Sequence, residues 1–121
     1  MSYQHRELAS GRWRKLPLVE QMANIGSEVE RALNWRGKNN QDYCARAVDR
    51  ALELLDLSLE TPWGFARLKE IARLREIVVD YFYGSNQYGS TEAAFRRYFL
   101  PFAWAARSRA SMPSTPSRIL N

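Results

Sequence analysis

Apolar side chains recur along this chain at intervals of three and four residues, and short stretches of turn-forming residues interrupt them. In the first such stretch, spacings of four, three, four and four residues separate Leu18, Met22, Ile25, Val29 and Leu33. That spacing places the side chains on one face of an α-helix, whereas a half-buried β-strand would alternate apolar and polar residues. No alternating pattern competes elsewhere in the sequence. The chain is therefore predicted to be all-α.

Turn residues and helix caps divide the chain into four helices. The first is expected over about 17–35, and Gly37 with the residues after it forms a turn. Asn40 then offers a side-chain acceptor to the free N–H groups of a second helix, which is expected to end by Glu60. The apolar positions of this second helix are rich in leucine, which suits a helix packed along one face.

Two further start signals define the second half of the chain. Thr61 followed by Pro62 is typical of a helix start, because threonine can cap and proline fits the first helical position. This third helix is expected to reach about Tyr83, where two glycines, a serine and an asparagine within seven residues predict a loop. Ser90 or Thr91 then caps the fourth helix.

The 121 residues fit a single domain. Short connections favour antiparallel neighbours, so we predict an antiparallel up-down-up-down four-helix bundle over residues 17–109. A basic N-terminal segment, residues 1–16, precedes the bundle, and a disordered tail, residues 110–121, follows it. Pro101 falls inside the fourth helix and is expected to kink it.

Few residues are suited to catalysis. His5 is the only histidine, so neither a histidine-based triad nor a Glu-x-x-His metal site can be assembled on the helices. No glycine-rich phosphate loop is present either. Cys44 lies on the apolar stripe of the second helix and is most simply a small core residue. We therefore expect a protein that is not an enzyme and that needs no metal or cofactor.

The sequence offers no candidate for membrane insertion. The N-terminal residues lack the apolar core of a secretory signal. No apolar run approaches the roughly 20 residues that span a bilayer. The single cysteine, Cys44, cannot form a disulfide within the chain. A cytoplasmic protein with no membrane partner is expected.

Basic residues outnumber acidic ones, and their excess is unevenly distributed. The formal net charge is +5, and fifteen of the eighteen basic residues are arginine, whose planar guanidinium suits phosphate. Residues 1–15 and 90–109 each carry three more basic than acidic residues, whereas residues 41–60 carry three more acidic ones. These charges predict a surface that binds the phosphate backbone of RNA or DNA. The residues predicted to contact it are Arg12, Arg14, Lys15, Arg67, Lys69, Arg73, Arg75, Arg96, Arg97 and Arg107.

Two features of this surface allow a second interpretation. An arginine-rich, solvated surface also arises where a genome favours arginine codons, and net charge bears on solubility as well as on partners.

Trp13, Trp35 and Trp63 lie near predicted helix boundaries, where an indole could stack on a base. Indoles at such positions also close the ends of bundles, and this is the interpretation we favour.

The fourth helix is apolar around much of its circumference. One bundle interface needs only about 100° or slightly more of a helix surface. Large apolar patches beyond that requirement usually mark interaction sites. We therefore predict a homo-oligomer or a dedicated protein partner. The predicted interface residues are Phe95, Phe99, Leu100 and Trp104.

Two segments carry a resemblance to a known family. Residues 50–57 read RALELLDL, and residues 67–76 read RLKEIARLRE, which joins leucines to basic residues. Over about residues 17–107 the chain resembles the four-helix-bundle family that contains the accessory variability determinant (Avd) of diversity-generating retroelements and the 23S rRNA intervening-sequence proteins. The resemblance implies a basic, barrel-shaped pentamer that binds nucleic acid and, in the retroelement, partners a reverse transcriptase.

Charge, missing catalytic residues and resemblance together predict a non-enzymatic, oligomeric accessory protein. It would bind the RNA or DNA backbone and assist a reverse transcriptase in a diversity-generating retroelement. A protein-binding scaffold is one alternative, in which the arginines meet an acidic protein face. A small helical subunit of a ribonucleoprotein effector complex is another.

Overall fold

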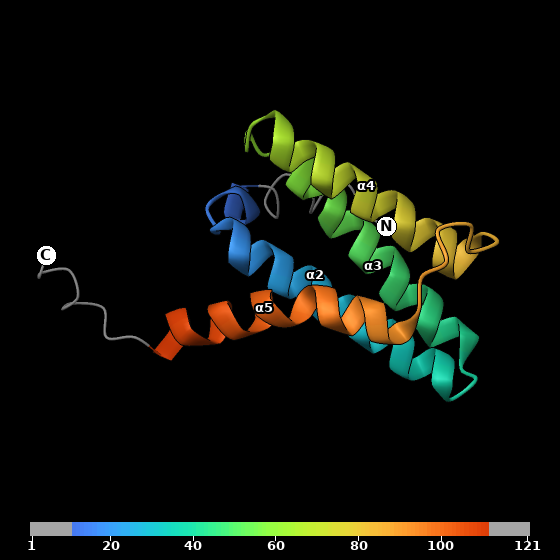
Figure 1. Ribbon diagram of the computed structural model, residues 1–121. Coiled ribbons are helices and arrows are strands. Elements are labelled where there is room, and N and C mark those ends of the chain that lie inside the picture. The colour runs from blue at the N-terminus through green and yellow to red at the C-terminus, as the bar shows by residue number, and fades with distance from the viewer. Residues whose placement is uncertain (1–10, 112–121) are drawn as a thin grey trace, which may run out of the picture.

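The computed structural model describes residues 11–111, and this part of the chain consists of helices joined by turns and loops, with no strand. A short helix over residues 11–14 precedes four long helices. These are α2 (Leu18–Gly37), α3 (Gln41–Leu59), α4 (Phe65–Tyr83) and α5 (Glu92–Ser111), shown in Figure 1. Within this described part, no helix is both long and apolar enough to cross a membrane.

The predicted segments at both ends are covered only in part. Residues 11–16 of the predicted basic segment are described, and residues 1–10 lie outside the described residues. The tail was predicted from residue 110, but α5 continues through residue 111, since neither proline nor glycine occurs between Pro101 and Pro113. The predicted disorder of residues 112–121 also lies outside the described residues.

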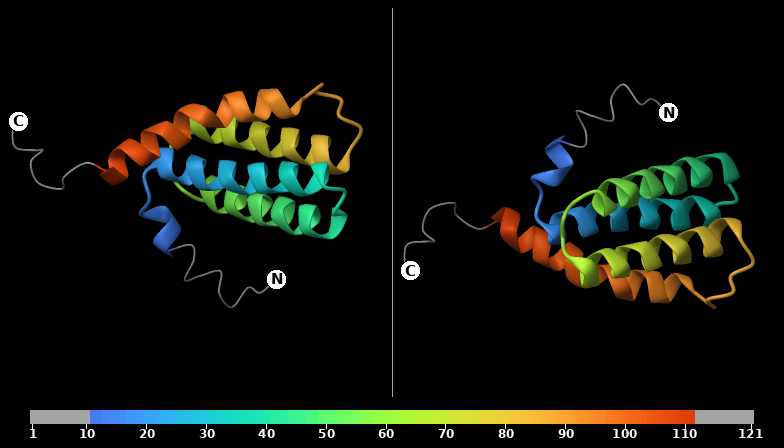
Figure 2. Two further views of the ribbon diagram at one scale, coloured as in Figure 1. Left: turned by 90° about the horizontal axis from the view of Figure 1, so that it is seen from below. Right: turned by 90° about the horizontal axis from the view of Figure 1, so that it is seen from above.

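The long helices form a bundle that is open along one side. The α2 helix packs against both α3 and α5, and α3 also packs against α4 (Figure 2). Although α4 and α5 follow one another in the chain, they do not pack closely together. A groove therefore remains between these two helices.

The core is built from the predicted apolar stripes. In α2 the buried residues include Met22, Ile25, Val29 and Leu33, as the spacing predicted. Burying each of these large side chains contributes about 1.5–3 kcal/mol relative to leaving it exposed. The other helices add the buried residues Ala47, Val48, Ala51, Leu55, Leu57, Ile71, Leu74, Val78, Phe95 and Phe99.

The α2–α5 contact is especially close at Gly26. A Cβ atom built at this position would lie 2.8 Å from both Cγ and Cδ1 of Phe99 and 3.0 Å from its Cβ. Those Phe99 atoms lie near its backbone, so they have little freedom to move aside. Gly26 therefore lets the Phe99 ring pack directly on the backbone of α2.

Two predicted caps are confirmed. The Asn40 side chain accepts a hydrogen bond from the backbone N–H of Tyr43, at 3.0 Å, and starts α3. The Thr91 hydroxyl oxygen accepts from the backbone N–H of Ala94, also at 3.0 Å, and starts α5. Each cap satisfies an N–H group that the helix itself leaves free.

The predicted start of the third helix at Thr61 and Pro62 is wrong. The α4 helix begins at Phe65, and Gly64 occupies the cap position with a φ of +99°, a conformation that favours glycine. Thr61 is buried, and its hydroxyl donates back to the Leu57 carbonyl at 3.3 Å. The threonine therefore satisfies the end of α3 instead of the start of α4.

The predicted loop after α4 is confirmed and is held by one carboxylate. The Asp80 side chain accepts hydrogen bonds from the backbone N–H groups of Gln87, at 2.8 Å, and Tyr88, at 3.0 Å. Asn86 and Gly89 adopt positive φ values of 57° and 66°, as tight turns require. The loop thereby fixes the distance between α4 and α5 at this end.

Pro101 lies inside α5, which runs on to Ser111 as one helix. Proline removes one hydrogen bond of the helix ladder and crowds the carbonyl four residues earlier. The ribbon of α5 changes direction near its middle in both Figure 1 and Figure 2. This bend agrees with the kink expected from the sequence.

Candidate nucleic-acid interface

A buried polar network fixes the described part of the basic segment to the bundle. The Trp13 indole N–H donates to the Ser58 hydroxyl at 3.0 Å, and that hydroxyl donates to Gln21 Oε1 at 2.7 Å. Gln21 Nε2 in turn donates to the Trp13 carbonyl at 2.8 Å. All three residues are buried. The short helix is therefore anchored where α2 begins and α3 ends.

The end of α5 reaches the same end of the bundle. Arg109 Nε donates to a Glu20 carboxylate oxygen at 3.2 Å, beside Gln21 in the first turns of α2. Figure 2 shows the short helix, the last turns of α5 and the α3–α4 connection at this common end. We call this region the basic end, because Arg12, Arg14, Lys15, Arg67, Arg107 and Arg109 belong to it.

Four cations at the basic end are exposed and lack a carboxylate partner within the described residues. Arg12, Arg14 and Lys15 surround the buried Trp13 in sequence and point away from the core. Arg107 lies in the last turns of α5, with its guanidinium 5.9 Å from the centre of the Trp104 ring. Because no acidic side chain of residues 11–109 pairs with them, this part of the chain leaves these cations to meet an anion.

Three of the predicted phosphate contacts are instead balanced by carboxylates. Arg75 Nε donates to Asp56 at 2.7 Å, linking α4 to α3. Arg67 lies 3.7 Å from Glu70, one turn further along α4. Exposed pairs of this kind contribute about 0–1 kcal/mol to stability, yet they cancel positive charge locally.

Arg96 is the third balanced cation and has two carboxylate partners. It donates to Glu30 of α2 at 2.9 Å and to Glu92 at 3.2 Å. The hydrogen bond to Glu30 and the two negative charges raise the pKa of Arg96 above its usual value. Arg96 thus connects α5 to α2.

The ten predicted nucleic-acid residues do not form one patch. Lys69 and Arg73 line the groove between α4 and α5. Arg97 is exposed near the start of α5, away from the basic end. Arg109 was not predicted, although the charge excess of residues 90–109 already included it. Only the meeting of α5 with α2 places it at the basic end.

The predicted interface on α5 needs correction at two residues. Phe95 and Phe99 are 4% and 7% exposed, because they pack inward against α2 and the rest of the core. They add little to the outer surface of α5, although Phe95 lines the groove between α4 and α5. Leu100 and Trp104, at 54% and 62% exposed, do face outward.

Three of the four tryptophans, Trp13, Trp35 and Trp63, pack within the described chain. Trp13 is buried, and Trp63 packs against the core with an indole N–H that finds no acceptor among the described residues. Trp35 is half-buried and meets the Tyr43 ring edge-on, with ring centres 4.8 Å apart. Trp104, by contrast, is exposed on α5.

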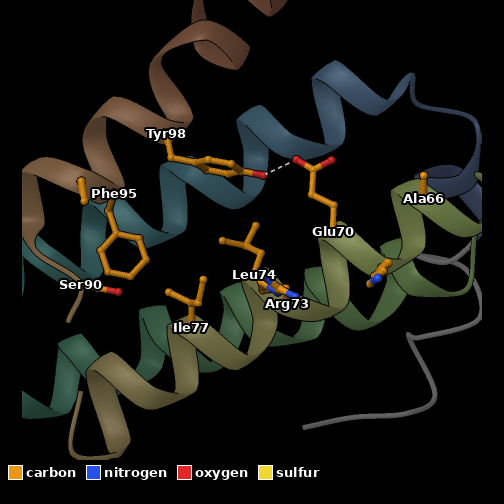
Figure 3. A pocket seen from close by; sticks show the side chains of 10 residues that line it. Ala66, Glu70, Arg73, Leu74, Ile77, Ser90, Phe95 and Tyr98 are labelled. Atoms are coloured by element: carbon orange, nitrogen blue, oxygen red, sulfur yellow. Dashed lines mark hydrogen bonds between the residues drawn. The ribbon is translucent and has the colours of Figure 1, made fainter. Parts of the chain in front are cut away.

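The groove between α4 and α5 combines an apolar floor with charged edges (Figure 3). It encloses about 470 Å³, and Leu74, Ile77 and Phe95 supply much of its apolar lining. The Tyr98 hydroxyl crosses the groove and donates to a Glu70 carboxylate oxygen at 2.8 Å. This hydrogen bond is a direct link between the two poorly packed helices.

Burial, followed by the hydrogen bond to Glu70 and its negative charge, raises the pKa of Tyr98 well above the ordinary tyrosine value. An unfolded tyrosine loses its proton near pH 10, while the folded one keeps it. The stability from this difference is therefore complete below about pH 10 and is lost as the pH rises towards the folded pKa.

Replacing Tyr98 by phenylalanine should remove this pH dependence. Below pH 10 the variant is expected to be less stable than the native chain by about 1 kcal/mol, the net contribution of one hydrogen bond. The gap should stay nearly constant from about pH 8 to about pH 10 and narrow as the pH rises from there towards 12. Denaturant unfolding of both proteins across that range would measure the gap. A constant or widening gap would contradict the role given to the Tyr98–Glu70 link.

Cys44, the one cysteine of the chain, is not activated as a nucleophile. Burial raises the pKa of the Cys44 thiol above its ordinary value, despite the nearby positive charge of Arg36. A raised pKa disfavours the nucleophilic thiolate. Among the described residues, no three His, Cys, Asp or Glu side chains gather closely enough to hold a metal ion.

Comparison of the chain with protein-family models, curated proteins and solved structures finds no match. Function is therefore inferred from the charges and cavities described above.

Proposed function

We propose that this protein is a non-enzymatic accessory protein that binds the phosphate backbone of nucleic acid through its basic end. The main support is the group of four exposed cations, Arg12, Arg14, Lys15 and Arg107, without carboxylate partners in the described structure. They come from two segments far apart in the sequence. The Trp13 network and the Arg109–Glu20 pair bring those segments to one end of the bundle.

Such a site predicts a specific dependence on salt. Each phosphate that a protein neutralises releases counterions, so log K falls with log salt by roughly 0.7 per contact for single strands and 0.9 for duplex DNA. Four contacts therefore correspond to a slope of roughly −3 to −4. The cations carry no base-reading geometry, so binding should depend little on sequence.

The test compares two triple variants with equal loss of charge. In the first, Arg12→Gln, Arg14→Gln and Lys15→Gln remove cations from the basic end. In the control, Lys38→Gln, Arg46→Gln and Arg50→Gln remove exposed cations from α3 and the α2–α3 turn. Salt titrations with a single-stranded RNA and a duplex DNA would measure the slopes.

The first variant should lose roughly 2–3 units of slope, whereas the control should keep the native slope. Equal losses in both variants would mean that net charge alone drives binding. No binding by the native protein at low salt, or binding indifferent to salt, would overturn the proposal.

The same proposal includes contact with other protein molecules. Leu100 and Trp104 form an exposed apolar pair on α5, which supports a homo-oligomer or a dedicated partner. The resemblance to the retroelement accessory family favours a reverse transcriptase as that partner, and a protein-binding scaffold remains the second candidate function. Sedimentation velocity, with and without a reverse transcriptase, would measure both kinds of association.

We also propose that the four long helices run alternately up and down. Contacts between opposite helix ends support this topology. Arg109 near the end of α5 pairs with Glu20 near the start of α2, while Tyr83 at the end of α4 donates to Asp49 in the first half of α3, at 2.9 Å. A mixing of parallel and antiparallel neighbours in an experimental structure would contradict it.

A further inference from the structure

The groove between α4 and α5 occupies the place of a missing helix–helix contact. It extends along α4 from Ala66 to Ile77, a distance of about 16 Å at 1.5 Å per residue. That length corresponds to three helical turns. Figure 3 shows the two helices on either side, with Leu74, Ile77 and Phe95 directed into the space between them.

Two cations accompany this apolar floor. Lys69 and Arg73 belong to the groove lining and lie one helical turn apart on α4, so their side chains are neighbours of like charge. Both are exposed, and within residues 11–109 neither forms an ion pair. The acidic residues nearest to them in sequence have other partners: Glu70 is engaged by Tyr98 and Arg67, and Glu76 accepts from the Tyr88 hydroxyl at 2.9 Å.

We infer that the groove binds an amphipathic helix of a protein partner. The partner helix would place an apolar ridge on Leu74 and Ile77 and two carboxylates, one turn apart, against Lys69 and Arg73. This spacing matches because residues four apart on a helix have Cβ atoms about 5–6 Å apart. Recognition of a helix by an apolar groove with matching edge charges is a common mode of binding.

The charge and the apolar surface of the groove together favour an amphipathic helix over a nucleic-acid backbone or a fatty acid. A nucleic-acid backbone would satisfy Lys69 and Arg73, but it would leave the floor around Leu74 and Ile77 in water. A single-chain fatty acid would cover the floor, but its one carboxylate would leave one of two neighbouring cations unpaired. A helix with an acidic pair satisfies both features of the groove.

The experiment selects ligands from a displayed library of amphipathic helices about four turns long. Each member carries a fixed leucine ridge, and two flanking positions one turn apart vary among Glu, Gln and Lys. Selected peptides are then measured by fluorescence anisotropy against the native full chain and its variants. Enrichment of the Glu–Glu pair by at least about tenfold over Lys–Lys is expected.

Variants of the groove make the result specific. Ala94 faces the groove and Ala93 is exposed beside it, so Ala94→Phe fills the site while Ala93→Phe is a matched control. Ala94→Phe and the double variant Lys69→Gln, Arg73→Gln should each weaken peptide binding by about tenfold or more. The control should bind like the native chain, and thermal melting would verify that all variants fold.

The groove proposal can fail independently of the proposal that nucleic acid binds at the basic end. The helix assignment would be overturned if the selection enriched peptides without acidic pairs. It would also be overturned if a peptide bound Ala94→Phe as tightly as the native chain, even if RNA binding remained. The assignment would equally be overturned if Lys69→Gln, Arg73→Gln weakened RNA binding and left peptide binding intact. Dodecanoate that binds the groove when no peptide does would identify an anionic amphiphile as the occupant instead.

Discussion

Replacing Gln21 by methionine is expected to destabilise the protein by about 2–4 kcal/mol. Methionine keeps the length of the side chain but can neither donate to the Trp13 carbonyl nor accept from the Ser58 hydroxyl. Each buried polar group left without a partner costs about 1–3 kcal/mol. The added apolar surface offsets only part of that cost.

Gln41→Met provides the matched control, because Gln41 is exposed at the start of α3 and forms no such network. Denaturant unfolding should place the control within about 0.5 kcal/mol of the native chain. The Gln21 variant should also expose the short helix, which faster cleavage near Trp13 by a protease would report. Near-native stability of this variant would contradict the proposed network.

Replacing Gly26 by alanine is expected to cost about 1–3 kcal/mol, although alanine favours a helix by about 1 kcal/mol over glycine. The new methyl group would lie 2.8 Å from the Phe99 ring, and α2 and α5 would have to separate to admit it. Gly37→Ala tests the opposite case, since no atom lies within 4 Å of a Cβ built there. The unfolding free energy of the Gly37→Ala variant should equal or slightly exceed that of the native chain.

A double substitution identifies the cause. Combining Gly26→Ala with Phe99→Ala should cost less than the sum of the single changes, because alanine at position 99 lacks the Cγ and Cδ1 atoms that lie closest to the new methyl group. The unfolding free energies of the four proteins in this cycle measure the difference. Additive costs would show that the Gly26–Phe99 contact does not limit the approach of α2 and α5.

Much of the fold follows from local properties of the sequence. The spacing of apolar residues predicted α2, and the chemistry of Asn40 and Thr91 predicted two helix starts, because capping depends on neighbouring residues. The start of α4 was misplaced because Thr61 does not cap it. Thr61 donates to a carbonyl at the end of α3, and Gly64, with a positive φ, occupies the cap position of α4. A local pattern cannot decide between two adjacent helix ends.

The candidate site was less predictable because it depends on contacts between distant residues. Charge counts found the basic segments, but they could not show that Glu30 neutralises Arg96 from 66 residues away. They also could not separate the buried aromatic positions of α5 from the exposed ones, since Phe99 is buried through its contact with Gly26. Tertiary contacts decide which charges and rings remain available.

Anchoring through Trp13 has a thermodynamic consequence for the cations around it. A flexible basic arm must be ordered when it binds, and that ordering costs about 1–2 kcal/mol of backbone entropy per residue. Here the residues around Trp13 are already ordered by the hydrogen bonds to Ser58 and Gln21. In the proposed complex, the backbone that carries Arg12, Arg14 and Lys15 would be ordered before an anion binds, and more of the electrostatic attraction would be retained as affinity.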